Sequence, residues 1–254
     1  MPNHVTNKLF LKGSEGDIKR LVEIVGGDGE AFNVNRFFPM PEKLKATSSP
    51  ARIISDDEYS DWLKRKKSGK LTPYEEMSNG PLTQEMSDNL KRVYGHDNWY
   101  DWALDNWGSK WGSYDSEYDE ELGVFTFLSA WDPPARAIMR LSKLFPHVEL
   151  KLHYADEAFG YNTGECIFKA GRLVSQYTPE TGIDSYIFAM TINGDEDYCK
   201  SRLNMYDPDM DKIDDEFIMF CIILAHKKDY EFDIKVYVYN EQQDAILIYV
   251  FKQC

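Results

Sequence analysis

The order strand, helix, strand is the feature that most restricts the fold of this sequence, because the chain shows it twice. The first unit begins at residues 5–11 (VTNKLFL), where apolar and polar residues alternate as in a strand. Apolar residues at helical spacing follow between Ser14 and Gly26. Residues 31–38 (AFNVNRFF) are predicted to form the second strand, which ends at the PMP motif.

The second unit starts at residues 124–129 (VFTFLS), another predicted strand. An amphipathic helix follows and ends before Pro146. A strand at 148–154 comes next, and then a hairpin formed by 165–168 and 173–176. Two such units packed together predict an α+β, ferredoxin-like fold, an antiparallel sheet with helices on one face.

The stretch between the two units, residues 45–120, is polar, charged and rich in turn residues. Amphipathic spacing predicts helices at about 57–67 and 82–94. A further helix would be capped by Asp97 or Asn98. We therefore expect a helical insertion within the ferredoxin-like domain.

The composition changes after residue 180, which divides the chain into a domain at 1–180 and a module at 181–254. Residues 180–216 hold eleven acidic and three basic residues. The second region is therefore predicted to be a small acidic α/β module.

Three apolar stretches give this C-terminal module its predicted elements. A strand is expected at 186–192 (YIFAMTI). Residues 217–225 (FIMFCIILA) form an apolar run that suits either a buried strand or a helix. A terminal hairpin is expected at 234–239 and 245–251.

The charge balance limits the possible partners. The chain has 254 residues and a formal net charge of -14, which argues against ordinary binding to nucleic acid or to an anionic membrane. An acidic surface would suit a basic protein partner, although acidic charge also simply keeps proteins soluble. We expect an acidic partner surface at the end of the acidic stretch: Asp207, Asp209, Asp211, Asp214, Asp215 and Glu216.

Sequence features predict a cytoplasmic protein. No run of about 18 apolar residues exists, and the N-terminus lacks the pattern of a secretory signal. The four cysteines are widely spread without a CxxC motif, which indicates reduced thiols. The sequence sets no oligomeric state.

A calcium site is the one metal site that the sequence suggests. Asp207, Asp209 and Asp211 have the spacing of a calcium-binding loop. Lys212 stands where that loop needs a glycine, and Ile218 stands where it needs a bidentate glutamate. A solvated acidic loop is the better interpretation, and we expect neither a metal nor a cofactor.

Signatures of catalysis are missing from the sequence. It has no P-loop, no GxSxG motif and no HxxxH or HExxH spacing. An enzyme would have to use Asp132, His153 and Glu157, with His153 beside a carboxylate as a base. We expect no catalytic residues and a protein that is not an enzyme.

The sequence NWGSKWGSYD at residues 106–115 places two tryptophans four residues apart among glycines. One interpretation is that both indoles clamp the inserted helices onto the sheet. The other is a binding surface in which Lys110 and one indole face outward. With Trp131 and the mixed polar and aromatic loop 155–164, the candidate binding residues are Trp107, Lys110, Trp111, Trp131, Asp156, Glu157, Phe159, Tyr161 and Asn162.

Five separated motifs occur in order: MPNHVTNKLFLKG, FNVNRFFPMP, NWGSKWGSYD, SAWDPPARAIMRLSKLFP and YADEAFGYNTG. Together they resemble the DUF1281 family, the YubB/Api92-like ferredoxin-like proteins of plasmids and bacteriophages. The resemblance covers roughly residues 1 to 180. It implies a ferredoxin-like domain and a mobile-element source, and it brings no activity and no catalytic residues.

Two functions are expected. The first is a non-enzymatic, acidic phage or plasmid protein that binds a host or phage protein, as an anti-defence inhibitor or DNA mimic. A basic, nucleic-acid-binding defence protein is one candidate partner. The second is a module that binds or sequesters a small molecule or nucleotide at the tryptophan and glycine segment.

Overall fold

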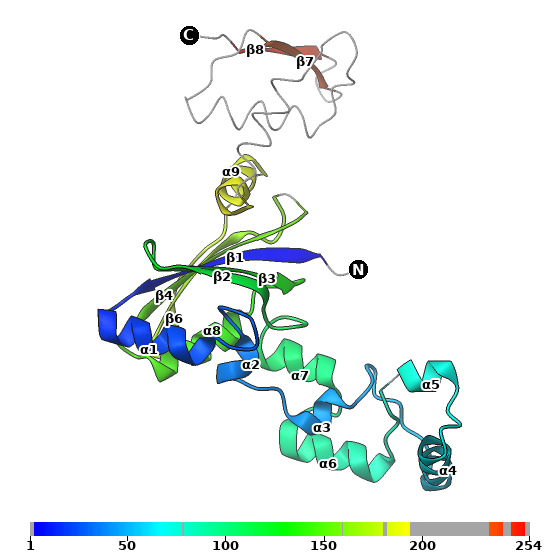
Figure 1. The fold of residues 1–254 in the computed structure, drawn as a ribbon. Coiled ribbons are helices and arrows are strands. Elements are labelled where there is room, and N and C mark those ends of the chain that lie inside the picture. Colours follow the sequence, from blue (N-terminus) through cyan, green and yellow to red (C-terminus); the bar gives the residue numbers. More distant parts are fainter. Residues whose placement is uncertain are drawn as a thin grey trace.

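The computed structural model describes residues 3–77, 79–158, 160–179, 182–193, 234–240 and 245–251. Its main feature is a six-stranded, antiparallel sheet with the strand order β2-β3-β1-β4-β5-β6 (Figure 1). The strands are β1 (His4–Lys12), β2 (Tyr114–Asp119), β3 (Val124–Ala130), β4 (Glu149–Asp156), β5 (Gly164–Lys169) and β6 (Arg172–Tyr177).

The first four strands and two helices make up a ferredoxin-like arrangement. Helices α1 (Glu15–Val25) and α8 (Ala135–Leu144) lie on one face of the sheet (Figure 1). Strand β1 lies between β3 and β4, and its inward side chains Val5 and Leu9 are fully buried. The α+β, ferredoxin-like fold predicted from the sequence is thus confirmed, and the β5-β6 hairpin extends the sheet beyond β4.

The predicted strand at 31–38 is wrong, because this segment is a loop followed by the short helix α2 (Val34–Phe37). The Asn33 side chain caps α2 by accepting a hydrogen bond from the Asn35 amide. The N–H groups of Phe32 and Val34 donate to serine hydroxyls near β2 instead of to a sheet ladder. The second strand of the fold is β2, which lies inside the predicted insertion.

The polar insertion is mainly helical, as predicted, and much of it projects away from the sheet (Figure 1). Asn98 caps the last of its helices by accepting from the Asp101 amide at 2.9 Å. Asp97, the alternative cap, instead accepts from the Ser87 hydroxyl at 2.6 Å. The helices are α3 (Glu42–Lys45), α4 (Asp56–Lys67), α5 (Pro73–Met77), α6 (Gln84–Tyr94) and α7 (Trp99–Asn106).

Helix α9 (Gly182–Asn193) replaces the strand predicted at 186–192, so that prediction is wrong. Ala189 and Ile192 pack on Ala155 of β4, on the sheet face opposite α1 and α8 (Figure 1). The short apolar run carries no periodicity that separates a strand from a helix, and burial against the sheet stabilises the helix.

The C-terminal hairpin was predicted correctly: β7 (Ile234–Asn240) pairs antiparallel with β8 (Ala245–Phe251). The segment 217–225 and the acidic residues from Asp207 to Glu216 lie outside the described residues. The division at residue 181 stays a prediction. Of the helices that the structure describes, none has the length and apolar character needed to cross a membrane.

Candidate binding site

The turn after α7 separates the two tryptophans of the 106–115 segment. Gly108 and Gly112 both have left-handed backbone conformations, with φ of 89° and 76°. The Ser109 hydroxyl accepts a hydrogen bond from the Gly112 amide at 3.1 Å and thereby closes the turn. As a result, the chain reverses between Trp107 and Trp111, and the two indoles enter different surroundings.

Trp107 belongs to the core, with 3% of its surface exposed. Its indole N–H donates to the carbonyl oxygen of Phe38 at 2.9 Å. Its ring meets the ring of Trp102 edge to face, with 5.4 Å between the centroids. For Trp107, the structure therefore supports the interpretation as a clamp between the inserted helices and the sheet.

Trp111, in contrast, is 44% exposed and forms a surface cluster with Lys110 and Trp131. The Lys110 ammonium lies 4.8 Å from the Trp111 ring centroid and 4.5 Å from that of Trp131. The backbone N–H of Lys110 donates to the carbonyl oxygen of Ala130 at the end of β3. This hydrogen bond places Lys110 beside the turn that carries Trp131. We call Lys110, Trp111 and Trp131 the Trp–Lys cluster.

Two indole faces on one ammonium form a double cation–π contact, worth about 0.5–1 kcal/mol for each pair at an exposed site. Lys110 forms no ion pair with any residue that the structure describes. Its charge is therefore held in place while it stays available to an anion.

A cleft of about 370 Å³ adjoins this cluster. Lys45 also lines this cleft and brings a second ammonium group to it. That ammonium forms an ion pair with Glu42 at 2.6 Å. The amide of Asn79 is fixed because it donates to the backbone oxygens of Lys45 and Thr47. The lining combines aromatic faces, amides and cations: Asn35, Met40, Lys45, Asn79, Trp99, Trp107, Lys110 and Trp111.

Several of these residues were missed by sequence reasoning. Asn35, Lys45 and Asn79 lie in three separate segments that the folded insertion brings to Trp111. No local motif marks them, because each is an ordinary polar residue of a loop or helix. Sequence reasoning could not show that these separate segments fold next to Trp111.

The loop 155–164 supports the cluster through the backbone of Trp131. The Asn162 side-chain amide donates to the Trp131 carbonyl oxygen at 2.8 Å. Trp131 is 38% exposed and adopts a left-handed conformation, with φ of 70°. Tyr161 is exposed at 73%, and Phe159 lies outside the described residues.

The two carboxylates predicted in this loop do not join the cleft. Asp156 is buried and accepts hydrogen bonds from the Asn3 side chain at 3.1 Å and the Ala158 amide at 2.7 Å. It therefore shapes the turn. Glu157 lines a separate hollow together with His4.

The residues proposed for an enzyme have different neighbours. His153 contacts Glu165 at 2.6 Å, and burial lowers the pKa of His153 in spite of that carboxylate. Partial desolvation and the charge of Asp156 raise the pKa of Asp132. The carboxylate beside His153 is that of Glu165, whereas Glu157, named with His153 for the enzyme hypothesis, lines the separate hollow near His4. Nor does any described cluster of His, Cys, Asp and Glu form a site for a metal ion.

The strand order and helices place the sheet region in the class of α+β, ferredoxin-like domains. Residues 107–198 match a family model, DUF1281_C, described as "Ferredoxin-like domain in Api92-like protein". This match confirms the resemblance to the DUF1281 family, and the matched region includes the Trp–Lys cluster. No curated protein matches the chain significantly.

A solved structure of the protein api92 from Yersinia pseudotuberculosis, assigned to the DUF1281 family, is also similar. It is 11% identical, and the alignment covers 71% of this chain and 99% of that chain with a TM-score of 0.39.

Proposed function

We propose that this protein is a non-enzymatic binding protein whose cleft beside the Trp–Lys cluster takes a nucleotide or a closely similar flat anion. The observation that carries the proposal is the exposed ring of Trp111, held against the Lys110 ammonium at the edge of a 370 Å³ cleft. The volume falls within the usual range for small-molecule sites, about 300–1,000 Å³.

The chemistry of the lining supports this ligand class. A nucleobase presents a flat face, and stacking on an aromatic side chain is worth about 1–3 kcal/mol per base. A phosphate group needs cations, which Lys110 and Lys45 supply at the same cleft. The oriented amide of Asn79 provides a polar group that would help to fix the ligand.

Titration of the full chain with AMP, followed by calorimetry and tryptophan fluorescence, tests this proposal. We expect saturable binding that Trp111→Ala weakens by about tenfold or more, as the loss of one stacking face predicts. Tyr74→Ala is the matched control, since Tyr74 is an exposed aromatic residue outside the cleft. Absence of AMP binding, or equal binding by the Trp111 variant, would reject the proposed ligand class.

A second candidate function rests on charge. The net charge of -14 would steer the protein toward a basic groove on a host or phage protein, as in DNA mimicry or the inhibition of a defence enzyme. The resemblance to phage and plasmid proteins supports this setting, in the cytoplasm of a bacterial host.

Affinity purification from a bacterial host, followed by binding assays of the recovered partner at low and high salt, tests this second function. We expect affinity to fall steeply as salt rises. Binding that is independent of salt would rule out the electrostatic version.

A further inference from the structure

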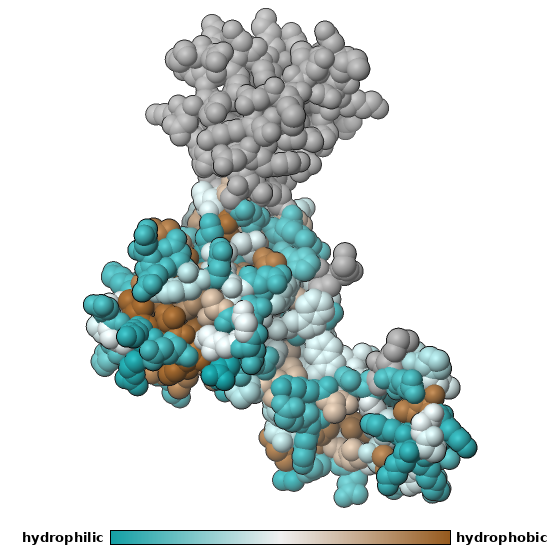
Figure 2. All heavy atoms as spheres, in the orientation of Figure 1, coloured by the Kyte–Doolittle hydropathy of each residue, from teal (hydrophilic) through white to brown (hydrophobic). Residues whose placement is uncertain are grey.

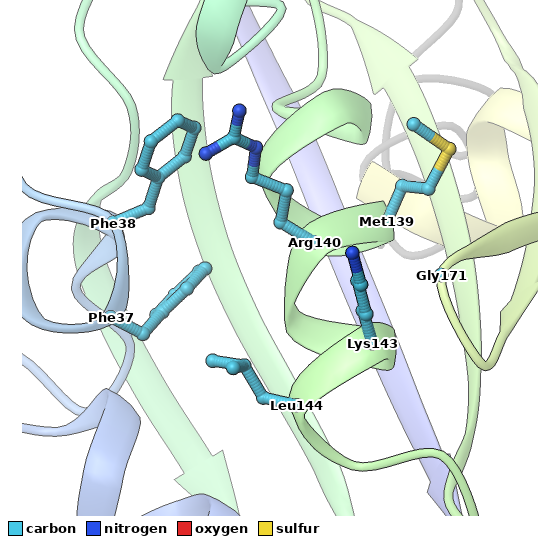
Figure 3. A pocket seen from close by; sticks show the side chains of 7 residues that line it. All are labelled: Phe37, Phe38, Met139, Arg140, Lys143, Leu144 and Gly171. Carbon is cyan, nitrogen blue, oxygen red and sulfur yellow. The ribbon is translucent and has the colours of Figure 1, made fainter.

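A second pocket, of about 670 Å³, opens on the helix side of the sheet domain, and it does not share a lining residue with the Trp–Lys cleft. Helix α2 and the residue after it contribute Phe37 and Phe38, and the β5-β6 turn contributes Gly171 (Figure 3). Helix α8 contributes the rest of the lining: Met139, Arg140, Lys143 and Leu144.

The apolar wall of this pocket is accessible to a ligand. Phe37 and Leu144 point toward one another across the pocket (Figure 3), and Leu144 is 59% exposed. Figure 2 shows apolar surface gathered over the helix layer, surrounded by hydrophilic residues. Exposed apolar surface of this kind commonly marks a binding site.

Contacts on both sides hold the pocket open. The carbonyl oxygen of Phe38 accepts from the buried Trp107 indole, which fixes the aromatic wall. On the opposite side, the Gly171 amide donates to the Ser142 hydroxyl at 3.0 Å and ties the turn to α8. A Cβ atom at Gly171 would lie 3.0 Å from the Cβ of Lys143, so glycine leaves room for that side chain.

Both polar side chains of the pocket are cationic, although the chain as a whole is strongly acidic. The Arg140 guanidinium lies 4.0 Å from the Phe38 ring centroid, which orients it by a cation–π contact. Within the described residues, neither Arg140 nor Lys143 forms an ion pair. No acidic residue lines the pocket.

We infer that this pocket binds an amphipathic carboxylate of the fatty-acid class. The acyl chain would lie along Phe37 and Leu144, and the carboxylate would pair with Arg140 and Lys143. A mostly apolar pocket with a few well-placed polar groups is the usual form of such a site. Two cations on successive turns of one helix select an anion over a neutral lipid.

Calorimetric titration of the full chain with decanoate tests the inference, with decanol and hexanoate as comparisons. We expect decanol to bind about tenfold more weakly, because it lacks the charge. Hexanoate should bind about tenfold more weakly or worse, because it buries four fewer methylenes. Decanoate that does not bind, or decanol that binds equally well, would overturn the inference.

Variants locate the binding site. Arg140→Gln and Lys143→Gln should each weaken decanoate binding by about fivefold, as expected for a charged contact in an open site. Arg20→Gln and Lys19→Gln are matched controls on the exposed surface of α1 and should change nothing. A double variant of Arg140 and Lys143 that binds decanoate like the wild type would also overturn the inference.

Discussion

Two regions meet at the 106–115 segment, the sheet core on one side of the turn and the open cleft on the other. Trp107 belongs to the core and only borders the cleft, whereas Trp111 is exposed at the cleft. Trp107 has 3% of its surface exposed and a hydrogen-bonded indole, whereas Trp111 is 44% exposed and contacts a lysine.

This difference shows that residue type and spacing alone do not assign a role to a tryptophan. The left-handed glycines allow the chain to reverse within four residues. One indole can therefore join the inserted helices to the sheet while the other remains available for a ligand. The two roles predict separate responses to substitution, with stability affected by one and binding by the other.

Trp107→Ala should lower the free energy of unfolding more than any other substitution considered. A small loss would contradict the contrast between a core Trp107 and an exposed Trp111. Loss of a buried indole typically costs about 3–5 kcal/mol of unfolding free energy. It would also leave the Phe38 carbonyl oxygen without its indole donor. Urea unfolding followed by circular dichroism measures the change, and a loss below about 1 kcal/mol would contradict the assignment of Trp107 to the core.

Local signals predicted the elements whose stabilising contacts are also local. Ser14 accepts from the Asp17 amide and starts α1 as its sequence context indicates. The hairpin at β5 and β6 follows from two short strands around Ala170 and Gly171. In both cases the residues that determine the element are close together in the sequence.

The errors occurred where distant residues decide the structure. Phe32 and Val34 donate to hydroxyls of Ser116 and Ser113, about eighty residues further along the chain. Their alternation resembled a strand, but no sequence pattern shows that side chains satisfy the backbone there. The cleft has the same origin, because Lys45 and Trp111 line one cleft only in the folded chain, although they are far apart in the sequence.

Gly112→Ala should have an intermediate effect, because it strains the turn that separates the two regions. A left-handed conformation costs a non-glycine residue about 1–2 kcal/mol, and the new Cβ would lie 3.3 Å from the Cβ of Val34. Gly95→Ala is the matched control, since Gly95 has φ of 84° and no atom near the position of its Cβ.

Urea unfolding of both glycine variants separates backbone strain from crowding. We expect Gly112→Ala to lose about 1 kcal/mol more than Gly95→Ala, since the contact adds to the same conformational cost. Equal losses would mean that the turn has room to adjust, and that the core does not determine the path of the chain to Trp111.

Trp111→Ala should have the smallest effect on stability, about 1 kcal/mol or less, because the indole is 44% exposed and its described ring contacts are with the Lys110 ammonium and the edge of Tyr114. A double-mutant cycle with Lys110→Gln isolates that contact, and we expect a coupling of about 0.5–1 kcal/mol. Urea unfolding of the wild type, both single variants and the double variant measures it. A loss above about 2 kcal/mol for Trp111→Ala would place this indole in the structural core beside Trp107, and its exposed face would then no longer support a ligand site.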